Sequence, residues 1–172
     1  PVKLEDNGAH ALCEHPGDSI NVKYNESIFV GYRWADKQKK TKPLFAFGHG
    51  LSYTTFAYGK ATATKKSLTA DETITFTVLV KNTGSREGSE VVQLYIGDKK
   101  SALPRPIKEL KGFSKVKLAP GEEKMVSFTI DKTDLSYYDD TQNRWVAEPG
   151  AFEAFVGASS ADIKSAVSFE LR

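Results

Sequence analysis

Apolar and polar residues alternate from residue 72 to residue 80, and this alternation constrains the fold more than any other feature. Ile74, Phe76, Val78 and Val80 fall on one face, and the threonines at 73, 75 and 77 fall on the other. A period of two with β-branched residues on both faces is typical of a half-buried β-strand. We therefore predict a strand here whose apolar face enters a core.

Shorter alternating runs follow it, separated by turn sequences such as Asn82-Thr83-Gly84 and Ala119-Pro120-Gly121. Further strands are predicted at 92–96, 110–118, 126–130, 145–146, 152–156 and 167–171. In the first of these, Tyr95 is placed on the face opposite the core. About seven strands over about 115 residues, without an amphipathic helix, predict an all-β, immunoglobulin or fibronectin type III-like antiparallel β-sandwich with an irregular N-terminal extension.

Composition excludes several other classes of protein. The chain has 172 residues, 40% hydrophobic, and can therefore bury a core. Its one basic run, the lysines at 37, 39, 40 and 42, lacks interleaved aromatics, so no nucleic-acid partner is predicted. Cys13 is the only cysteine, which excludes an internal disulfide and a cysteine-based zinc cluster. No apolar run approaches membrane-spanning length, so no membrane partner is predicted either.

Residues 43–56, with the sequence PLFAFGHGLSYTTF, form an unusual aromatic stretch that we call the connector. Large rings surround Gly48 and Gly50, which suggests a backbone with positive φ or one that approaches another surface very closely. The pattern is neither helical nor alternating. It favours an ordered segment joining two domains.

The residues before the connector are less regular. Residues 1–27 contain scattered glycine, asparagine and proline and are predicted to be loop. Residues 28–30 form a short strand-like run that ends at Gly31, and Tyr32 and Trp34 then flank Arg33. Such a group can line a sugar subsite or pin a linker to a protein surface. Pinning is favoured, because no second polar cluster lies nearby.

Together, residues 28–36 and 43–56 resemble the C-terminal region of family 3 glycoside hydrolases of the β-glucosidase type. The resemblance continues through 79–98, 105–122 and 148–163 and covers nearly the whole chain. It implies an enzyme with a barrel, an α/β sandwich and a C-terminal fibronectin type III-like domain. Residues 1–55 would then be the tail of the α/β sandwich domain with the connector, and residues 56–172 the fibronectin type III-like domain.

The resemblance also implies that this chain holds no catalytic residue. Retaining glycosidases need two carboxylates, and in this family the nucleophilic Asp belongs to the barrel and the acid/base Glu to the α/β sandwich domain. The pairs Asp139-Asp140 and Glu122-Glu123 lie at predicted turns, where solvation opposes the raised pKa that catalysis requires. We expect a non-catalytic accessory domain that braces the catalytic domains during β-glucoside hydrolysis, with no cofactor and no metal.

The expected partners are the upstream barrel and α/β sandwich domains of a parent enzyme, itself expected in the periplasm or outside the cell. The candidate docking side chains are Phe29, Tyr32, Arg33, Trp34, Phe45, Phe47, His49 and Tyr53. In this chain alone, the connector is expected to stay packed on the sandwich, with Phe56 entering the first strand. Residues 28–36 are expected to be held less firmly and to leave an apolar patch that favours self-association.

The alternative is a free-standing immunoglobulin-like module that binds carbohydrate or mediates adhesion. Such a module would present a planar row of exposed aromatics, and among the predicted strands only Tyr95 clearly points outward. Tyr137 and Tyr138 form a second candidate sugar platform, although one buried ring and one ring at the rim is the favoured interpretation. The alternative is therefore the weaker of the two.

Overall fold

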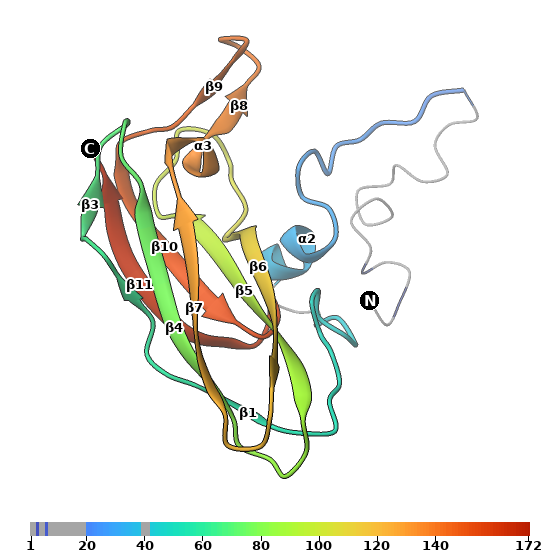
Figure 1. Cartoon of the computed structure of the whole chain (residues 1–172). Helices are drawn as coiled ribbons and strands as arrows, with labels where there is room; N and C mark the ends of the chain where they lie inside the picture. The colour runs from blue at the N-terminus through green and yellow to red at the C-terminus, as the bar shows by residue number, and fades with distance from the viewer. Residues whose placement is uncertain (1–2, 4–5, 7–19, 39–41) are drawn as a thin grey trace.

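The computed structural model describes residues 3, 6, 20–38 and 42–172, and two packed β-sheets make up most of it (Figure 1). The four-stranded sheet is built on β4 (Ile74–Asn82), which pairs along its length with β7 (Glu123–Ile130). Along its other edge, β4 pairs in turn with β1 (Phe56–Tyr58) and β2 (Thr62–Ala63). The first strand thus begins at Phe56, as predicted.

The five-stranded sheet has the order β3-β11-β10-β5-β6. Its strands are β3 (Ser67–Leu68), β5 (Gly88–Asp98), β6 (Glu109–Leu118), β10 (Gly150–Gly157) and β11 (Ile163–Leu171). All neighbours are antiparallel except β3 and β11. With β1 and β2 counted as one interrupted strand, the two sheets hold eight strands against about seven predicted, and the all-β sandwich is confirmed. The strand predicted at 145–146 lies outside both sheets.

A short helix and a small hairpin complete the sandwich at one end. Helix α3 (Lys132–Leu135) begins with a capping box, in which the Asp131 carboxylate accepts from the backbone N–H of Thr133. Strands β8 (Tyr137–Asp139) and β9 (Arg144–Val146) then form a separate two-stranded hairpin. This hairpin projects beyond the ends of the two sheets (Figure 1).

The core lies between the two sheets, on the predicted face of β4. The side chains of Ile74, Phe76, Val78 and Val80 are at most 1% exposed. Phe76 packs edge to face against Phe169 of β11, with ring centroids 5.2 Å apart, and so joins the two sheets. The period-two pattern therefore located the buried face correctly.

Tyr95 corrects one prediction. Its ring leaves the core face of β5, as predicted, but it is 0% exposed rather than outward-facing. The Tyr32 ring of helix α2 (Tyr32–Lys37) lies edge-on to it at 5.9 Å, and the ammonium of Lys108, from the segment before β6, is also 5.9 Å from the ring. The outer face of the five-stranded sheet is therefore partly buried by a segment from far upstream.

The strand-like run at 28–30 is a second correction. These residues belong to no strand. They lead through Gly31, at φ 58°, directly into α2, a helix that the sequence did not predict. Most of residues 1–20, predicted to be irregular, lie outside the described residues. In the described part of the chain, no helix combines the length and apolar character needed to cross a membrane.

Candidate interdomain docking surface

Helix α2 is bonded to the sandwich by polar contacts with residues 108–110. The phenol oxygen of Tyr32 accepts from the backbone N–H of Leu110 at 2.9 Å. Arg33 pairs with Glu109 at 3.1 Å, and the ammonium of Lys108 donates to Asp36 at 2.5 Å. These contacts contradict the prediction that residues 28–36 are held less firmly than the connector.

Tertiary contacts also explain why α2 exists. It has six residues and begins after Gly31, which has no side chain to cap it. An isolated helix of this length is unstable in water, because the cost of nucleation is not recovered in so few turns. The contacts at Tyr32, Arg33 and Asp36 recur on one side of the helix and supply the missing stability.

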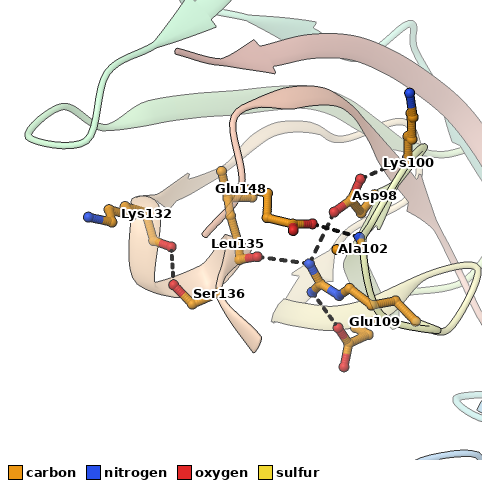
Figure 2. A network of polar contacts seen from close by, with 9 residues as sticks. Asp98, Lys100, Ala102, Glu109, Lys132, Leu135, Ser136 and Glu148 are labelled. Atoms are coloured by element: carbon orange, nitrogen blue, oxygen red, sulfur yellow. Dashed lines mark hydrogen bonds and ion pairs between the residues drawn. The ribbon is translucent and has the colours of Figure 1, made fainter. Parts of the chain in front are cut away.

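The segment that receives α2 is itself held by the buried guanidinium of Arg105. This group donates to Glu109 at 2.8 Å, to the Leu135 carbonyl at 2.9 Å and to Asp98 at 3.4 Å. Figure 2 shows Asp98, Glu109 and the Leu135 carbonyl converging from three different segments. A buried cation with two carboxylates and a carbonyl is well compensated. Glu109 is thereby fixed between Arg105 and Arg33.

The connector is attached to the same sheet face through a turn at Gly48. The side-chain amide of Gln93, 3% exposed, donates to the carbonyls of Gly48 at 3.2 Å and Ala158 at 2.7 Å. The hydroxyl of Tyr95 donates to the amide oxygen of the same side chain at 2.5 Å. In addition, the N–H of Ser160 donates to the Phe47 carbonyl at 2.9 Å. The backbone of the connector is therefore fixed at this turn.

Both reasons that the sequence suggested for a glycine, a positive φ and a close approach to another surface, apply at Gly48. Its φ is +80°, and a Cβ there would overlap the side-chain amide of Gln93. Gly50 meets neither, because its φ is not positive and no neighbouring atom lies within 4 Å of the position that a Cβ would take. Only one of the two glycines is thus required by the fold.

Of the predicted docking side chains, those in and just before α2 are partly buried on this chain. Tyr32 stacks on Phe47, with ring centroids 4.8 Å apart. The indole N–H of Trp34 donates to the Asp6 carbonyl at 3.1 Å, and the ammonium of Lys37 lies 4.0 Å from the centre of the Phe29 ring. Tyr32 and Arg33 thus contact the sandwich, through Leu110 and Glu109, whereas the contacts of Trp34 and Phe29 lie within the extension itself.

The predicted docking residues of the connector behave differently. Phe45 and His49 lie beside each other at 5.5 Å between ring centroids, but both are exposed, and Tyr53 is 93% exposed. The prediction that the connector packs on the sandwich therefore holds for its backbone at Gly48 and fails for most of its rings. We define the connector patch as the large exposed apolar side chains of this segment: Leu44, Phe45, Phe47, Leu51 and Tyr53.

One further exposed ring, missed by the sequence analysis, adjoins this patch. Phe113 of β6 is directly opposite Gln93 in the antiparallel ladder, so both side chains lie on the same face of the sheet. Because Gln93 is bonded to Gly48, Phe113 lies next to the connector turn and is largely exposed. The sequence could have indicated this exposure, because Phe113 falls within a predicted strand but on the face that does not enter the core.

Three of the four carboxylates considered for catalysis, Asp139, Glu122 and Glu123, have local structural partners. Asp139 is buried rather than solvated, and accepts hydrogen bonds from the hydroxyl and N–H of Thr141 and from the N–H and side-chain amide of Gln142. These donors, the Thr141 hydroxyl above all, lower the pKa of Asp139. Glu122 accepts from the N–H of Ala119 at 2.7 Å, and Glu123 pairs with Lys81 at 2.7 Å.

The tyrosine pair adopts the arrangement favoured by the sequence. Tyr137 is partly buried, with the Arg105 guanidinium 5.4 Å from its ring centre, whereas Tyr138 is 49% exposed. Within the described ranges, no group of three or more His, Cys, Asp or Glu side chains is placed to hold a metal ion.

The two packed, mostly antiparallel sheets define this protein as a fibronectin type III-like domain preceded by a structured connector, and residues 90–160 match the family described as "Fibronectin type III-like domain". The chain is 54% identical to the β-glucosidase BoGH3A of Bacteroides ovatus, over 99% of this chain and 23% of that protein. It is 48% identical to the thermostable β-glucosidase B of Acetivibrio thermocellus, over 95% of this chain and 21% of that protein.

Crystal structures give the same result. The GH3 β-glucosidase of Bifidobacterium adolescentis matches 99% of this chain with 24% of its own, at a TM-score of 0.90 and 36% identity. The β-glucosidase of Kluyveromyces marxianus matches 100% of this chain with 20% of its own, at a TM-score of 0.88 and 41% identity. The chain therefore corresponds to the fibronectin type III-like part of GH3 β-glucosidases, consistent with a C-terminal accessory domain of such enzymes. It spans less than a quarter of the length of these relatives.

Proposed function

We propose that this domain braces the catalytic domains of a β-glucosidase-type enzyme and docks against them through the connector patch. The observation that carries the proposal is the contrast within one segment. The connector backbone is fixed to the sandwich at Gly48, whereas its large apolar side chains face solvent. A segment that is rigidly attached and outwardly apolar is suited to bind a neighbouring domain.

The energy available from such docking is substantial. Full burial of one large apolar side chain is worth about 1.5 to 3 kcal/mol, so the patch favours a partner strongly. The relatives are larger enzymes in which this domain shares a chain with other domains, and more than three quarters of their length lies outside the match. The preceding domains are therefore the natural partner.

Rigidity supports a bracing role. Helix α2 and the connector are bonded to the same outer sheet face, through Glu109 and Gln93 respectively. A domain docked on this surface would be held in one orientation relative to the sandwich, because little conformational freedom remains to be lost on binding. By analogy with the relatives, the parent enzyme would hydrolyse β-glucosides with two carboxylates supplied by its preceding domains.

The test is a chimera in which this chain replaces the matching segment of the Bacteroides ovatus relative. We expect the chimera to hydrolyse an aryl β-glucoside and to unfold at a single temperature, and we expect the relative lacking the segment to lose both properties. The double variant Phe45→Ser/Tyr53→Ser should lower the midpoint of thermal inactivation of the chimera. Met125→Ser is the matched control, since Met125 is 58% exposed on β7 of the other sheet. Equal midpoints for the patch variant and the control would refute the proposal.

The carbohydrate-binding or adhesion alternative has less support. Tyr95, the aromatic on which it depended, is buried beneath α2 and cannot stack on a sugar. In the isolated chain, the connector patch would instead favour self-association. Sedimentation equilibrium of the wild type and of Phe45→Ser/Tyr53→Ser over a dilution series tests this, and a wild type that is monomeric at every concentration would contradict it.

A further inference from the structure

We propose that the β8–β9 hairpin is a second docking element for the preceding domains, and that it binds them through Tyr138 and Trp145. This inference rests on the proposed bracing function and extends it to a surface outside the connector. The occupant is the part of the parent enzyme that precedes this chain.

Tyr138 and Trp145 form a prearranged aromatic pair. They are directly opposite each other in the β8–β9 ladder, with ring centroids 5.7 Å apart and planes at 73°. Trp145 is nevertheless 69% exposed and Tyr138 49% exposed. Tryptophan and tyrosine are enriched among the residues that dominate protein–protein binding, because they present large contact areas with few rotatable bonds. The pair therefore has the composition of an interface anchor.

The tip of the hairpin is ordered by polar contacts. The Tyr138 hydroxyl donates to the side-chain oxygen of Asn143 at 3.0 Å, and Asn143 itself takes φ 53° in the turn. Asp139 accepts from Thr141 at 2.6 Å and from the Gln142 side chain at 2.6 Å. These bonds restrict the turn before any partner binds, which lowers the entropic cost of docking.

The base of the hairpin is joined to α2 through Arg105. The guanidinium of Arg105 lies over the Tyr137 ring and donates to the Leu135 carbonyl, immediately before β8. It also donates to Glu109, which pairs with Arg33 of α2. The converging groups Leu135, Glu109 and Asp98 are visible in Figure 2. One buried cation, Arg105, thus contacts the base of the hairpin directly and α2 through Glu109.

The link between the hairpin and α2 through Arg105 supports the preceding domains as the partner that binds the hairpin. The described residues 20–31, which come before α2, extend away from the sandwich (Figure 1). The relatives place more than three quarters of their length outside this segment, enough to cover a second element. The Arg105 network fixes the position of the hairpin relative to α2. A partner that docks on α2 and the connector would therefore meet the hairpin in a defined position.

Hydrogen exchange measured by mass spectrometry on the isolated chain and on the chimera tests the proposal directly. We expect the amides of residues 137–146 and of the connector to exchange at least tenfold more slowly in the chimera. Slower exchange in the connector without any change at 137–146 would overturn this inference and leave the bracing function intact. No change in either segment would overturn both.

Variants test the contribution of the rings. We expect Tyr138→Ala/Trp145→Ala to shorten the half-life of chimera activity at elevated temperature at least tenfold, and to leave the melting temperature of the isolated chain close to that of the wild type. Trp145→Phe should retain most of the half-life, and Met125→Ala should leave it unchanged. If the double variant also lowered the melting temperature of the isolated chain substantially, the two rings would be needed for the stability of the domain itself, and the docking proposal would be overturned.

A sugar chain is the competing occupant. The fluorescence of Trp145 in a Trp34→Phe variant of the isolated chain should not change when a soluble β-linked gluco-oligosaccharide is added. A saturable change at submillimolar oligosaccharide would identify the hairpin as a carbohydrate site and overturn the docking proposal.

Discussion

The side-chain amide of Gln93 donates a hydrogen bond to the backbone carbonyl of Gly48, which lies 45 residues earlier in the chain, at 3.2 Å. This bond attaches the connector to the outer face of the five-stranded sheet. Gln93 is also bonded to Ala158 and Tyr95, so its position is fixed from several sides. The turn at Gly48 must therefore fit a side chain that cannot move without breaking buried hydrogen bonds.

Gly48→Ala is expected to destabilise this attachment. The new Cβ would displace the Gln93 amide and strain a backbone at φ +80°, and losing such buried bonds costs about 1 to 3 kcal/mol. Urea denaturation measures the loss, and limited proteolysis should show faster cleavage within residues 42–53. Gly50→Ala is the matched control, because nothing lies within 4 Å of its Cβ position. Equal effects of the two substitutions would show that the turn does not carry the attachment.

Phe76→Ala is expected to lower the free energy of unfolding by about 3 to 5 kcal/mol, because it removes a fully buried ring that joins the two sheets at Phe169. Chemical denaturation measures the change. Met125→Ala, on the exposed face of β7, should change stability by no more than about 0.5 kcal/mol. A loss below about 1 kcal/mol for Phe76→Ala would mean that this ring is not central to the core.

Glu90→Gln is expected to change how stability depends on pH. Burial, first of all, raises the pKa of Glu90, whose carboxylate accepts from the Tyr58 hydroxyl at 2.7 Å across the two sheets. A raised folded-state pKa gives stability that is present below the unfolded value and lost as pH rises through the folded value. The variant, neutral throughout, should therefore gain stability relative to wild type as pH rises from the unfolded value of about 4 through the raised folded value.

Thermal melts of both proteins across that range measure the difference. Tyr58→Phe is the companion variant, since it removes the donor and leaves the carboxylate buried. A constant difference between Glu90→Gln and wild type at every pH would show that Glu90 does not titrate with a raised pKa in the folded protein.

Breaking the pair between Asp36 and Lys108 is expected to release helix α2. Both side chains are largely buried, so Asp36→Asn and Lys108→Met should each cost about 1 to 3 kcal/mol, with a coupling energy above about 0.5 kcal/mol in a double-mutant cycle. Release should also raise the quenching of Trp34 by iodide, measured in a Trp145→Phe background. Additive effects of the two substitutions would indicate that the pair does not hold the helix.

The isolated chain is expected to show no hydrolysis of aryl β-glucosides. Asp139, Glu122 and Glu123 have structural partners, and hydrogen bonds lower the pKa of Asp139, which opposes a role as general acid. Steady-state assays with a chromogenic substrate measure this. Turnover that survives repurification and disappears in Asp139→Asn would overturn the expectation.

The sequence by itself determined the sandwich and its core. Alternation places Ile74 and Phe76 on one side of β4 whatever the strand pairs with, because successive side chains of a strand point to opposite faces. The turn chemistry between the strands is equally local. The resemblance of the connector motifs to the family 3 enzymes likewise needed only residue types and their spacing.

The tertiary structure alone decided what covers the outer face of the five-stranded sheet. Tyr95 has the pattern of an exposed residue, and only the arrival of α2 buries it. That helix is too short to be stable by itself. Two of the hydrogen bonds that hold it, Lys108 to Asp36 and Leu110 to Tyr32, span 72 and 78 positions of the sequence respectively. Because such contacts depend on the folded path of the chain, no local pattern records them, and the same holds for the Arg105 network that links α2 to the β8–β9 hairpin.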